Sequence, residues 1–140
     1  MIGTIVIAAA LQAATPAVAP VADWRAVPVA GGSWIWRAVP GGSEAVFTDV
    51  RGAQFALRCT VASRRVSLTR TGAISGAPLV VRTSSGDRTL PWIANLPATD
   101  PLLDAIAFSR GKFAVEVAGA PRLVVPAWPE AARAVEDCRK

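Results

Sequence analysis

Two cysteines, Cys59 and Cys138, are the residues of this 140-residue chain with the clearest covalent chemistry. Cys59 ends an alternation of apolar residues that starts at Phe55, and such alternation places side chains on one face of a strand. Cys138 ends a series that starts at Trp128 and has the spacing of one helix face. Because both sulfur atoms face inward, we predict a disulfide formed in an oxidising compartment. The alternative is a pair of buried free thiols in a cytosolic protein.

The composition excludes several classes of active site. The sequence contains no histidine and no tyrosine, so no imidazole is available as the base for a serine or cysteine nucleophile. The usual zinc and transition-metal sites need sets of nitrogen and sulfur ligands that this chain lacks. No glycine-rich loop has the spacing and the following helix that phosphate binding requires. We therefore expect a protein that is not an enzyme and has neither cofactor nor metal site.

The carboxylates have structural explanations in the predicted helices. Asp100 precedes Pro101, as is typical of a helix N-cap followed by the first helical residue. Asp104 lies in the first turn, where a negative charge is favourable. Asp137 lies late in the last predicted helix, where a carboxylate is slightly unfavourable, so we expect a salt bridge from it to an arginine of the sheet. A glycan-cleaving enzyme built only on carboxylates stays open as an alternative.

Arginines are the most informative candidates for binding. In the segment 51–90 they far outnumber the acids, of which Asp87 is the only one. Strand alternation places Arg58 and Arg65 outward beside hydroxyl side chains, and we expect Arg82 to share that face because it adjoins an inward valine. Such a basic side of a sheet suits phosphates, carboxylates or an acidic partner strand. The alternative is a merely solvated face. Nucleic acid is not expected, because no aromatic residues interleave with these arginines.

Two tryptophans form a second candidate binding surface. In the triplet Trp34-Ile35-Trp36, strand geometry places both indole rings on one side. The rings belong either to the core or to a platform on which a sugar or a partner stacks. A further alternative makes the region 34–40, or a loop, the plug of an inhibitor directed against an envelope hydrolase.

The first residues predict export. The apolar run from Ile5 to Leu11 is shorter than the roughly 17–25 residues of a membrane span. It fits the core of a secretory signal peptide with cleavage between Ala13 and Ala22, although no lysine or arginine precedes it. We therefore predict a signal peptide and Ala/Pro linker at 1–22, and no transmembrane segment in the mature chain. The alternative is an apolar tail on a cytosolic protein.

The rest of the sequence predicts a single disulfide-stapled domain at 23–140. The units 24–28 and 36–40 share the motif Trp-Arg-Ala-Val-Pro before a glycine turn, and we interpret both as strands. Further strands are expected at 44–48, 54–61, 65–70, 79–83, 88–93, 112–118 and 123–125. Spacing and capping residues predict a short inserted helix at about 101–110 and a C-terminal helix at about 129–138. The expected class is mainly β, an antiparallel β-sandwich or an open barrel.

The block 100–113, together with the ending 125–130 and 136–139, resembles a family of small uncharacterised exported proteins of Gram-negative bacteria that end in the motif WPE…EDCR. More distantly, the order of a strand cysteine, further strands and a terminal cysteine is similar to that of periplasmic β-sandwich proteins of the invasion-associated and type VI secretion-associated kinds. The resemblance implies a binding or accessory role and names no partner.

The functional prediction combines these observations. We expect a periplasmic or secreted, monomeric envelope protein that binds an anionic glycan, an anionic lipid or an envelope protein. The predicted binding residues are Arg58, Arg65, Arg82, Trp34 and Trp36. The hydrolase inhibitor and the carboxylate-only enzyme are the two alternatives from other functional classes.

Overall fold

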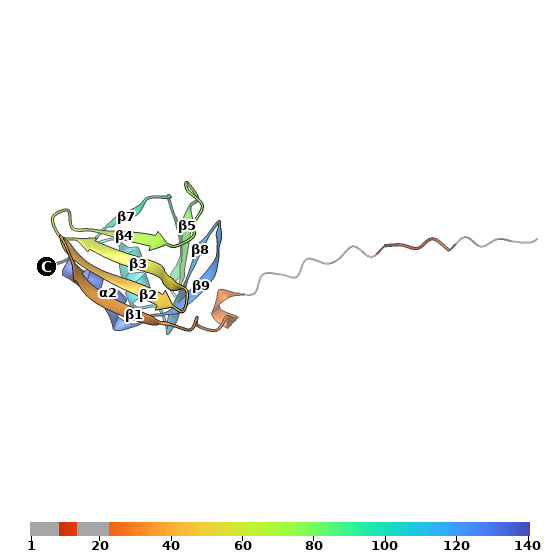
Figure 1. Ribbon diagram of the computed structural model, residues 1–140, viewed down its shortest axis with the longest axis horizontal. Coiled ribbons are helices and arrows are strands. Elements are labelled where there is room, and N and C mark those ends of the chain that lie inside the picture. Colours follow the sequence, from red (N-terminus) through yellow and green to blue (C-terminus); the bar gives the residue numbers. More distant parts are fainter. Residues whose placement is uncertain (1–8, 14–22) are drawn as a thin grey trace, which may run out of the picture.

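The computed structural model describes residues 9–13 and 23–140 (Figure 1). The predicted signal peptide and linker lie mostly outside the described residues and stay a prediction. In the described part of the chain, no helix is long and apolar enough to cross a membrane. Residues 23–140 form two antiparallel sheets with two α-helices, which confirms the expected mainly β class, and the sheets do not close into a barrel.

The first sheet, sheet A, has five strands in the order β1-β2-β3-β4-β7. Its strands are β1 (Ser33–Val39), β2 (Gly42–Asp49), β3 (Gly52–Thr60), β4 (Arg65–Arg70) and β7 (Ala94–Pro97). Short turns join β1 to β2, β2 to β3 and β3 to β4, so these four strands form a meander. The start of β2 approaches β3 closely at Gly42, because a Cβ atom there would clash with the carbonyl oxygen of Cys59.

The second sheet, sheet B, has four strands in the order β6-β5-β8-β9. Its strands are β5 (Leu79–Thr83), β6 (Gly86–Leu90), β8 (Lys112–Val117) and β9 (Ala120–Pro126). The chain passes from sheet A to sheet B after β4, returns for β7, and reaches sheet B again after the first helix. The chain therefore crosses between the sheets three times, and neighbours within each sheet pair antiparallel.

Aromatic side chains fill the space between the sheets. Trp34 packs with its ring centroid 5.7 Å from that of Phe47 and 6.2 Å from those of Phe55 and Phe113. All four side chains are buried. They come from β1, β2, β3 and β8, at the alternating positions that strand geometry points inward. The core is thus built from the apolar face of each strand, as the alternation predicts.

Two short helices close one side of the domain. α1 (Pro101–Ala107) begins as predicted, because the side chain of Asp100 accepts a hydrogen bond from the backbone N–H of Leu102 at 2.9 Å. α2 (Pro129–Asp137) buries small residues and a valine on one face and packs on β1, β2 and β3. The two helices also contact each other. Both end earlier than predicted, by three residues for α1 and one for α2.

One strand prediction is wrong, and a second has the wrong bounds. Residues Trp24–Ala26 form a short 3-10 helix, in which the side chain of Asp23 accepts from the backbone N–H of Arg25. Trp24 covers Ala114 and Val124 from outside the main core, so this tryptophan packs on sheet B without pairing as a strand. The expected strand at 88–93 is found as β6, which pairs with β5 but ends at Leu90, and β7, which begins at Ala94 in the other sheet, was not predicted. Proline at position 91 explains the break, because it cannot donate a ladder hydrogen bond.

Candidate functional site

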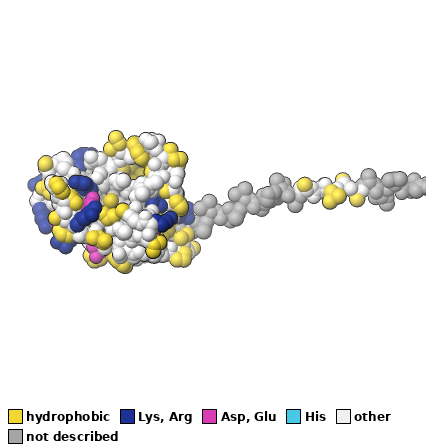
Figure 2. All heavy atoms as spheres, viewed as in Figure 1, with side chains coloured by type: hydrophobic (Ala, Val, Ile, Leu, Met, Phe, Trp, Pro, Cys, Tyr) yellow, Lys and Arg dark blue, Asp and Glu magenta, His cyan; other side chains and the backbone are white. Residues whose placement is uncertain are grey.

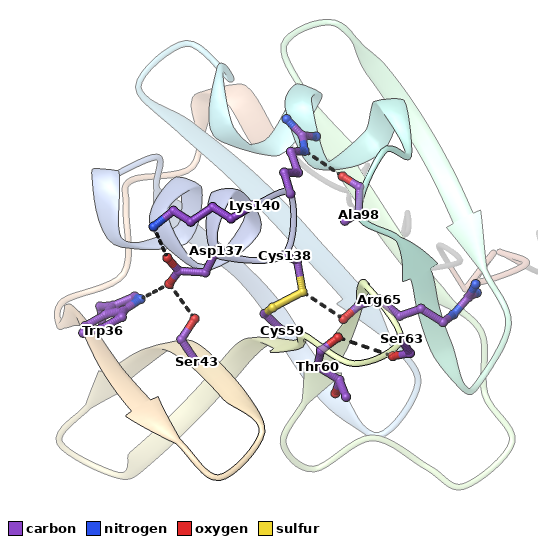
Figure 3. The surroundings of a disulfide bond; sticks show 11 residues. Trp36, Ser43, Cys59, Thr60, Ser63, Arg65, Ala98, Asp137, Cys138 and Lys140 are labelled. Atoms are coloured by element: carbon purple, nitrogen blue, oxygen red, sulfur yellow. Dashed lines mark hydrogen bonds and ion pairs between the residues drawn. A yellow bond between two sulfur atoms is a disulfide. The ribbon is translucent and has the colours of Figure 1, made fainter.

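The disulfide between Cys59 and Cys138 is present, as predicted, with the two Cα atoms 5.5 Å apart. Both cysteines are buried. The bond joins the end of β3 to the residue that follows α2, and so it holds the C-terminal helix against sheet A (Figure 3). Redox-active pairs usually lie close in sequence and are partly exposed. This one, with a sequence separation of 79 and both cysteines buried, has the features of a structural link.

Asp137 holds the same helix end through hydrogen bonds (Figure 3). Its Oδ2 atom accepts from the indole N–H of Trp36 at 3.0 Å and from the hydroxyl of Ser43 at 2.7 Å, and Oδ1 accepts from Lys140 at 3.1 Å. The predicted arginine partner is therefore wrong, because neutral donors of β1 and β2 reach this carboxylate from the sheet. Burial acts to raise the pKa of Asp137, but the hydrogen bonds from Ser43, Lys140 and Trp36 outweigh it and the pKa is lowered.

We expect Asp137→Ala to lower the free energy of unfolding by about 1–3 kcal/mol, because the buried Ser43 hydroxyl loses its acceptor. Urea unfolding at neutral pH measures the change. Glu136→Ala is the matched control, since that neighbouring carboxylate is exposed and its ion pair with Arg139 contributes less than about 1 kcal/mol. Equal changes in the free energy of unfolding for the two substitutions would contradict the stabilising role assigned to Asp137.

The contribution of Asp137 also has a defined pH dependence. Its pKa in the folded protein is lower than the unfolded value of about 3.9, so the stabilisation is present above that value. It is lost as the pH falls through the folded-state pKa. We therefore expect the stability difference between the wild type and Asp137→Ala to shrink below about pH 4. A difference that grows on acidification would show that the carboxylate is not stabilised in the fold.

The tryptophan pair does not form the stacking platform. Trp34 is only 4% exposed, and its indole N–H donates to the carbonyl oxygen of Pro126 on β9 at 2.8 Å. Trp36 is half-buried, and the guanidinium of Arg133 lies 3.4 Å from its ring centroid. Burial therefore removes Trp34 from the predicted binding residues, and Trp36 carries a cation of this chain on its ring. The region 34–40 lies mainly in the edge strand β1 and does not project as a loop.

The outer side of sheet A carries two of the predicted arginines. Arg58 on β3 lies opposite Ser67 on β4, and Arg65 on β4 lies opposite Thr60. The two arginines are thus diagonal neighbours on the face that points away from the core. A polar row continues across all five strands of the sheet, in the order Arg37, Glu44, Arg58, Ser67 and Asn95.

Arg82 belongs to the other sheet, which corrects the prediction of a shared face. It lies on β5 of sheet B and forms ion pairs with Glu116 and, at 2.7 Å, with Asp87. Strand alternation predicts which side of its own strand a residue occupies, but it does not tell which sheet the strand joins. The charge of Arg82 is therefore neutralised locally, away from Arg58 and Arg65.

Arg64 is a third arginine near Arg58 and Arg65, and it is exposed. It lies at the end of the β3–β4 turn with a φ of 50°, in the left-handed region that non-glycine residues seldom adopt. Strand alternation could not assign Arg64 to a face of the sheet, because Arg64 precedes β4. Its position next to Arg65, in the predicted connection between two strands, could still have indicated an exposed arginine. We call Arg58, Arg64 and Arg65, with the hydroxyls of Thr60 and Ser67, the basic face.

Ion pairing across the domain leaves the basic face without negative partners. All acidic residues are among the described residues, and every Asp and Glu except Glu130 forms an ion pair with another cation. Glu44, which lies opposite Arg58 in register, accepts from Arg37 at 2.6 Å. Within the described residues, the side chain of Arg58 donates only to the carbonyl oxygen of Pro40, at 3.5 Å.

The bonds of Arg65 use neutral acceptors. Its guanidinium donates to the side-chain and backbone oxygens of Asn95 at 2.9 and 2.8 Å. These bonds fix the guanidinium and leave its positive charge uncompensated. Arg58, Arg64 and Arg65 therefore present three cations without carboxylate partners in the described part of the chain.

A second group of cations borders a pocket near the 3-10 helix. Arg25, Arg110 and Lys112 line it beside Trp24. Arg25 pairs with Asp23 at 3.5 Å, and the ammonium group of Lys112 donates to a backbone carbonyl at 2.8 Å. Because Arg25 is paired with a carboxylate, this pocket has two cations without an ion pair in the described part of the chain, Arg110 and Lys112, against three on the basic face, and it serves as the comparison surface for experiments.

The arrangement suits binding. Within residues 9–13 and 23–140, no group of three or more acidic or cysteine side chains could hold a metal ion. Planar guanidinium groups beside hydroxyls instead match the oxygen atoms of phosphate and carboxylate groups.

Comparison of the chain with protein-family models, with curated protein sequences and with solved structures gives no match.

Proposed function

We propose that this is an exported, non-enzymatic binding protein that holds an anionic surface against the basic face of sheet A. The observation that carries the proposal is the lack of any carboxylate partner for Arg58, Arg64 and Arg65, while almost every carboxylate of the domain is paired elsewhere. A cation that the fold does not neutralise internally is free to bind an external anion.

The chemistry of the basic face favours phosphate or carboxylate groups repeated along a surface. Arg58 and Arg65 point from neighbouring strands of a five-stranded sheet and Arg64 lies exposed in the turn between those strands, so one flat anionic array can contact this end of the sheet. Lipid headgroups and acidic glycans share this chemistry. Since the groups are exposed, the attraction is screened by salt over about 10 Å at 0.1 M ionic strength.

Two observations support an exported location. The disulfide is of the kind that forms and persists in oxidising compartments such as the periplasm. The apolar run from Ile5 to Leu11 is typical of a signal peptide. The resemblance to small exported Gram-negative proteins agrees with both and stays a prediction, as do the monomeric state and the absence of an enzymatic activity.

We expect the variant Arg58→Gln/Arg64→Gly/Arg65→Gln to bind anionic surfaces about 100-fold more weakly, at about 1 kcal/mol for each lost arginine. Glycine at position 64 suits the left-handed backbone, so this substitution does not strain the turn. Sedimentation with phosphatidylglycerol vesicles and retention on immobilised polygalacturonate measure binding to the two sources of negative charge. Phosphatidylcholine vesicles serve as the uncharged reference.

The matched control is Arg25→Gln/Arg110→Gln/Arg133→Gln, which removes the same net charge from exposed positions outside the basic face. The proposal predicts that this control binds nearly as the wild type does and that rising salt weakens both. If the two triple variants lose the same affinity for anionic surfaces, net charge alone explains the binding and the basic face has no special role. If the protein binds an acidic protein but neither vesicles nor polysaccharide, its ligand is a protein partner and the proposed anionic surface is wrong.

A further inference from the structure

An apolar pocket of about 260 Å³ opens between the two sheets, on the side where β4 and β7 face β5 and β8. Its wall is mainly hydrophobic and includes Leu68, Ala77, Leu79, Trp92, Ala94 and Val117. Trp92 is 44% exposed and the adjoining Ile93 is 76% exposed, which marks this as the open side. Figure 2 shows hydrophobic side chains along the upper edge of the molecule, where Figure 1 places β7 and the loop 71–78.

Arg70 forms the polar part of the pocket wall. It follows Val66 and Leu68 in the inward alternation of β4 and is only 6% exposed. Its two terminal nitrogen atoms donate to the backbone oxygens of Gln54, Thr71 and Pro121 and to the Gln54 side chain, at 3.0–3.2 Å. All of these acceptors are neutral, so the bonds hold the guanidinium between the sheets without neutralising its charge.

Within the described residues, one nitrogen atom of Arg70 lacks a hydrogen-bond acceptor, and its charge lacks an ion-pair partner. Its Nε atom is buried and has no hydrogen-bond partner, and no carboxylate forms an ion pair with the guanidinium in the described part of the chain. Burial lowers the pKa of Arg70 and the nearby charge of Arg51 adds to this effect, while the nearby carboxylate of Asp49 opposes it only in part. A buried cation and a buried donor without partners are both costly. A carboxylate beside the guanidinium would neutralise the buried charge.

We propose that this pocket binds a small amphipathic monoanion, an aliphatic carboxylate whose chain fills the space between the sheets and whose carboxylate group pairs with the guanidinium of Arg70. The apolar wall accounts for the chain, and the unpaired guanidinium accounts for the charge. The pocket volume limits the ligand to medium length. This site is separate from the basic face, because Arg70 points inward from β4 while Arg65 points outward from the same strand.

Titration of the protein with decanoate and with decanol tests the charge requirement. We expect decanoate to bind with one-to-one stoichiometry and about 10- to 100-fold more tightly than decanol, the range typical of a hydrogen bond to a charged group. Calorimetry or the fluorescence of Trp92, at the pocket rim, reports binding. Equal affinity for the two ligands, or no binding of decanoate, would overturn the proposal.

Ala77→Trp tests the location without touching Arg70, since Ala77 lines the pocket and the larger side chain fills it. We expect this variant to lose decanoate binding and to keep the wild-type circular dichroism spectrum. Ala26→Trp, at an exposed position of the 3-10 helix, is the matched control and keeps binding. Decanoate binding that survives Ala77→Trp would place the ligand elsewhere and refute the site.

Failure of this proposal is distinguishable from failure of the proposed function. Decanoate should bind the variant Arg58→Gln/Arg64→Gly/Arg65→Gln with wild-type affinity, because those side chains lie outside the pocket. Loss of decanoate binding in that variant would assign the carboxylate to the basic face and would contradict the role given to Arg70.

Discussion

Replacement of both Cys59 and Cys138 by alanine is expected to lower the free energy of unfolding by about 4.5 kcal/mol. The disulfide closes a loop with a sequence separation of 79. In the chain-entropy model, opening a loop of this length frees many conformations of the unfolded chain. Typical domains are stable by only about 5–15 kcal/mol, so the link carries a large share of the total.

Guanidinium unfolding of the oxidised wild type and of the double alanine variant measures this difference. Hydrogen exchange gives a second readout, because loss of the link should release α2 before the strands of sheet A. A change below about 1 kcal/mol, with α2 as protected as before, would show that Asp137 and the buried face of the helix hold this element without the disulfide.

Trp34→Ala is expected to lower the free energy of unfolding by about 3–5 kcal/mol. The indole ring of Trp34 contacts Phe47 and Phe55 of sheet A and Phe113 of sheet B. Its N–H also donates to Pro126 on β9, so one side chain joins the two sheets by packing and by a hydrogen bond. Alanine would leave a cavity and an unsatisfied buried carbonyl oxygen.

Urea unfolding of three variants separates these effects. Trp34→Phe keeps an aromatic ring and removes the donor, so we expect it to cost about 1–3 kcal/mol, less than Trp34→Ala. Trp128→Ala is the control, since Trp128 is 42% exposed and contributes mostly surface contacts. If Trp128→Ala destabilises the domain as much as Trp34→Ala, the aromatic cluster is not the centre of the core.

The features predictable from the sequence are those set by local periodicity. The alternation ending at Cys59 and the helical spacing ending at Cys138 correctly point both sulfur atoms inward. Alternation also places Arg58 and Arg65 outward, as found. Asp100 caps α1 because its capping bond involves a residue only two positions away. In each case the deciding interaction lies within one strand or one helix turn.

The features that escape prediction depend on which elements meet in space. Arg82 has the expected alternation but lies in sheet B, because strand order is set by packing across the whole domain. Trp24 belongs to a repeated motif, yet its ring covers sheet B from outside and its backbone forms a 3-10 helix. Asp137 finds neutral donors on β1 and β2, which are distant in sequence.

Arg70 shows most clearly what strand alternation cannot predict. Its place in the series Val66, Leu68, Arg70 predicts an inward side chain, but a charged residue at such a position is readily taken for a strand end. Its four acceptor groups come from β3, β9 and the neighbouring loop. Only the assembled sheets bring these oxygens together, so the pocket site could not be derived from the pattern alone.

The central claim is that an anionic partner binds at the basic face. Backbone amide chemical shifts recorded during titration with a short polygalacturonate test it most directly, because they locate the bound ligand on the fold. The account predicts that the largest shifts occur in segments 58–67 and 95–97, and that they disappear as salt is added. Shifts concentrated around Trp24, Arg110 and Lys112, or none in sheet A, would contradict it.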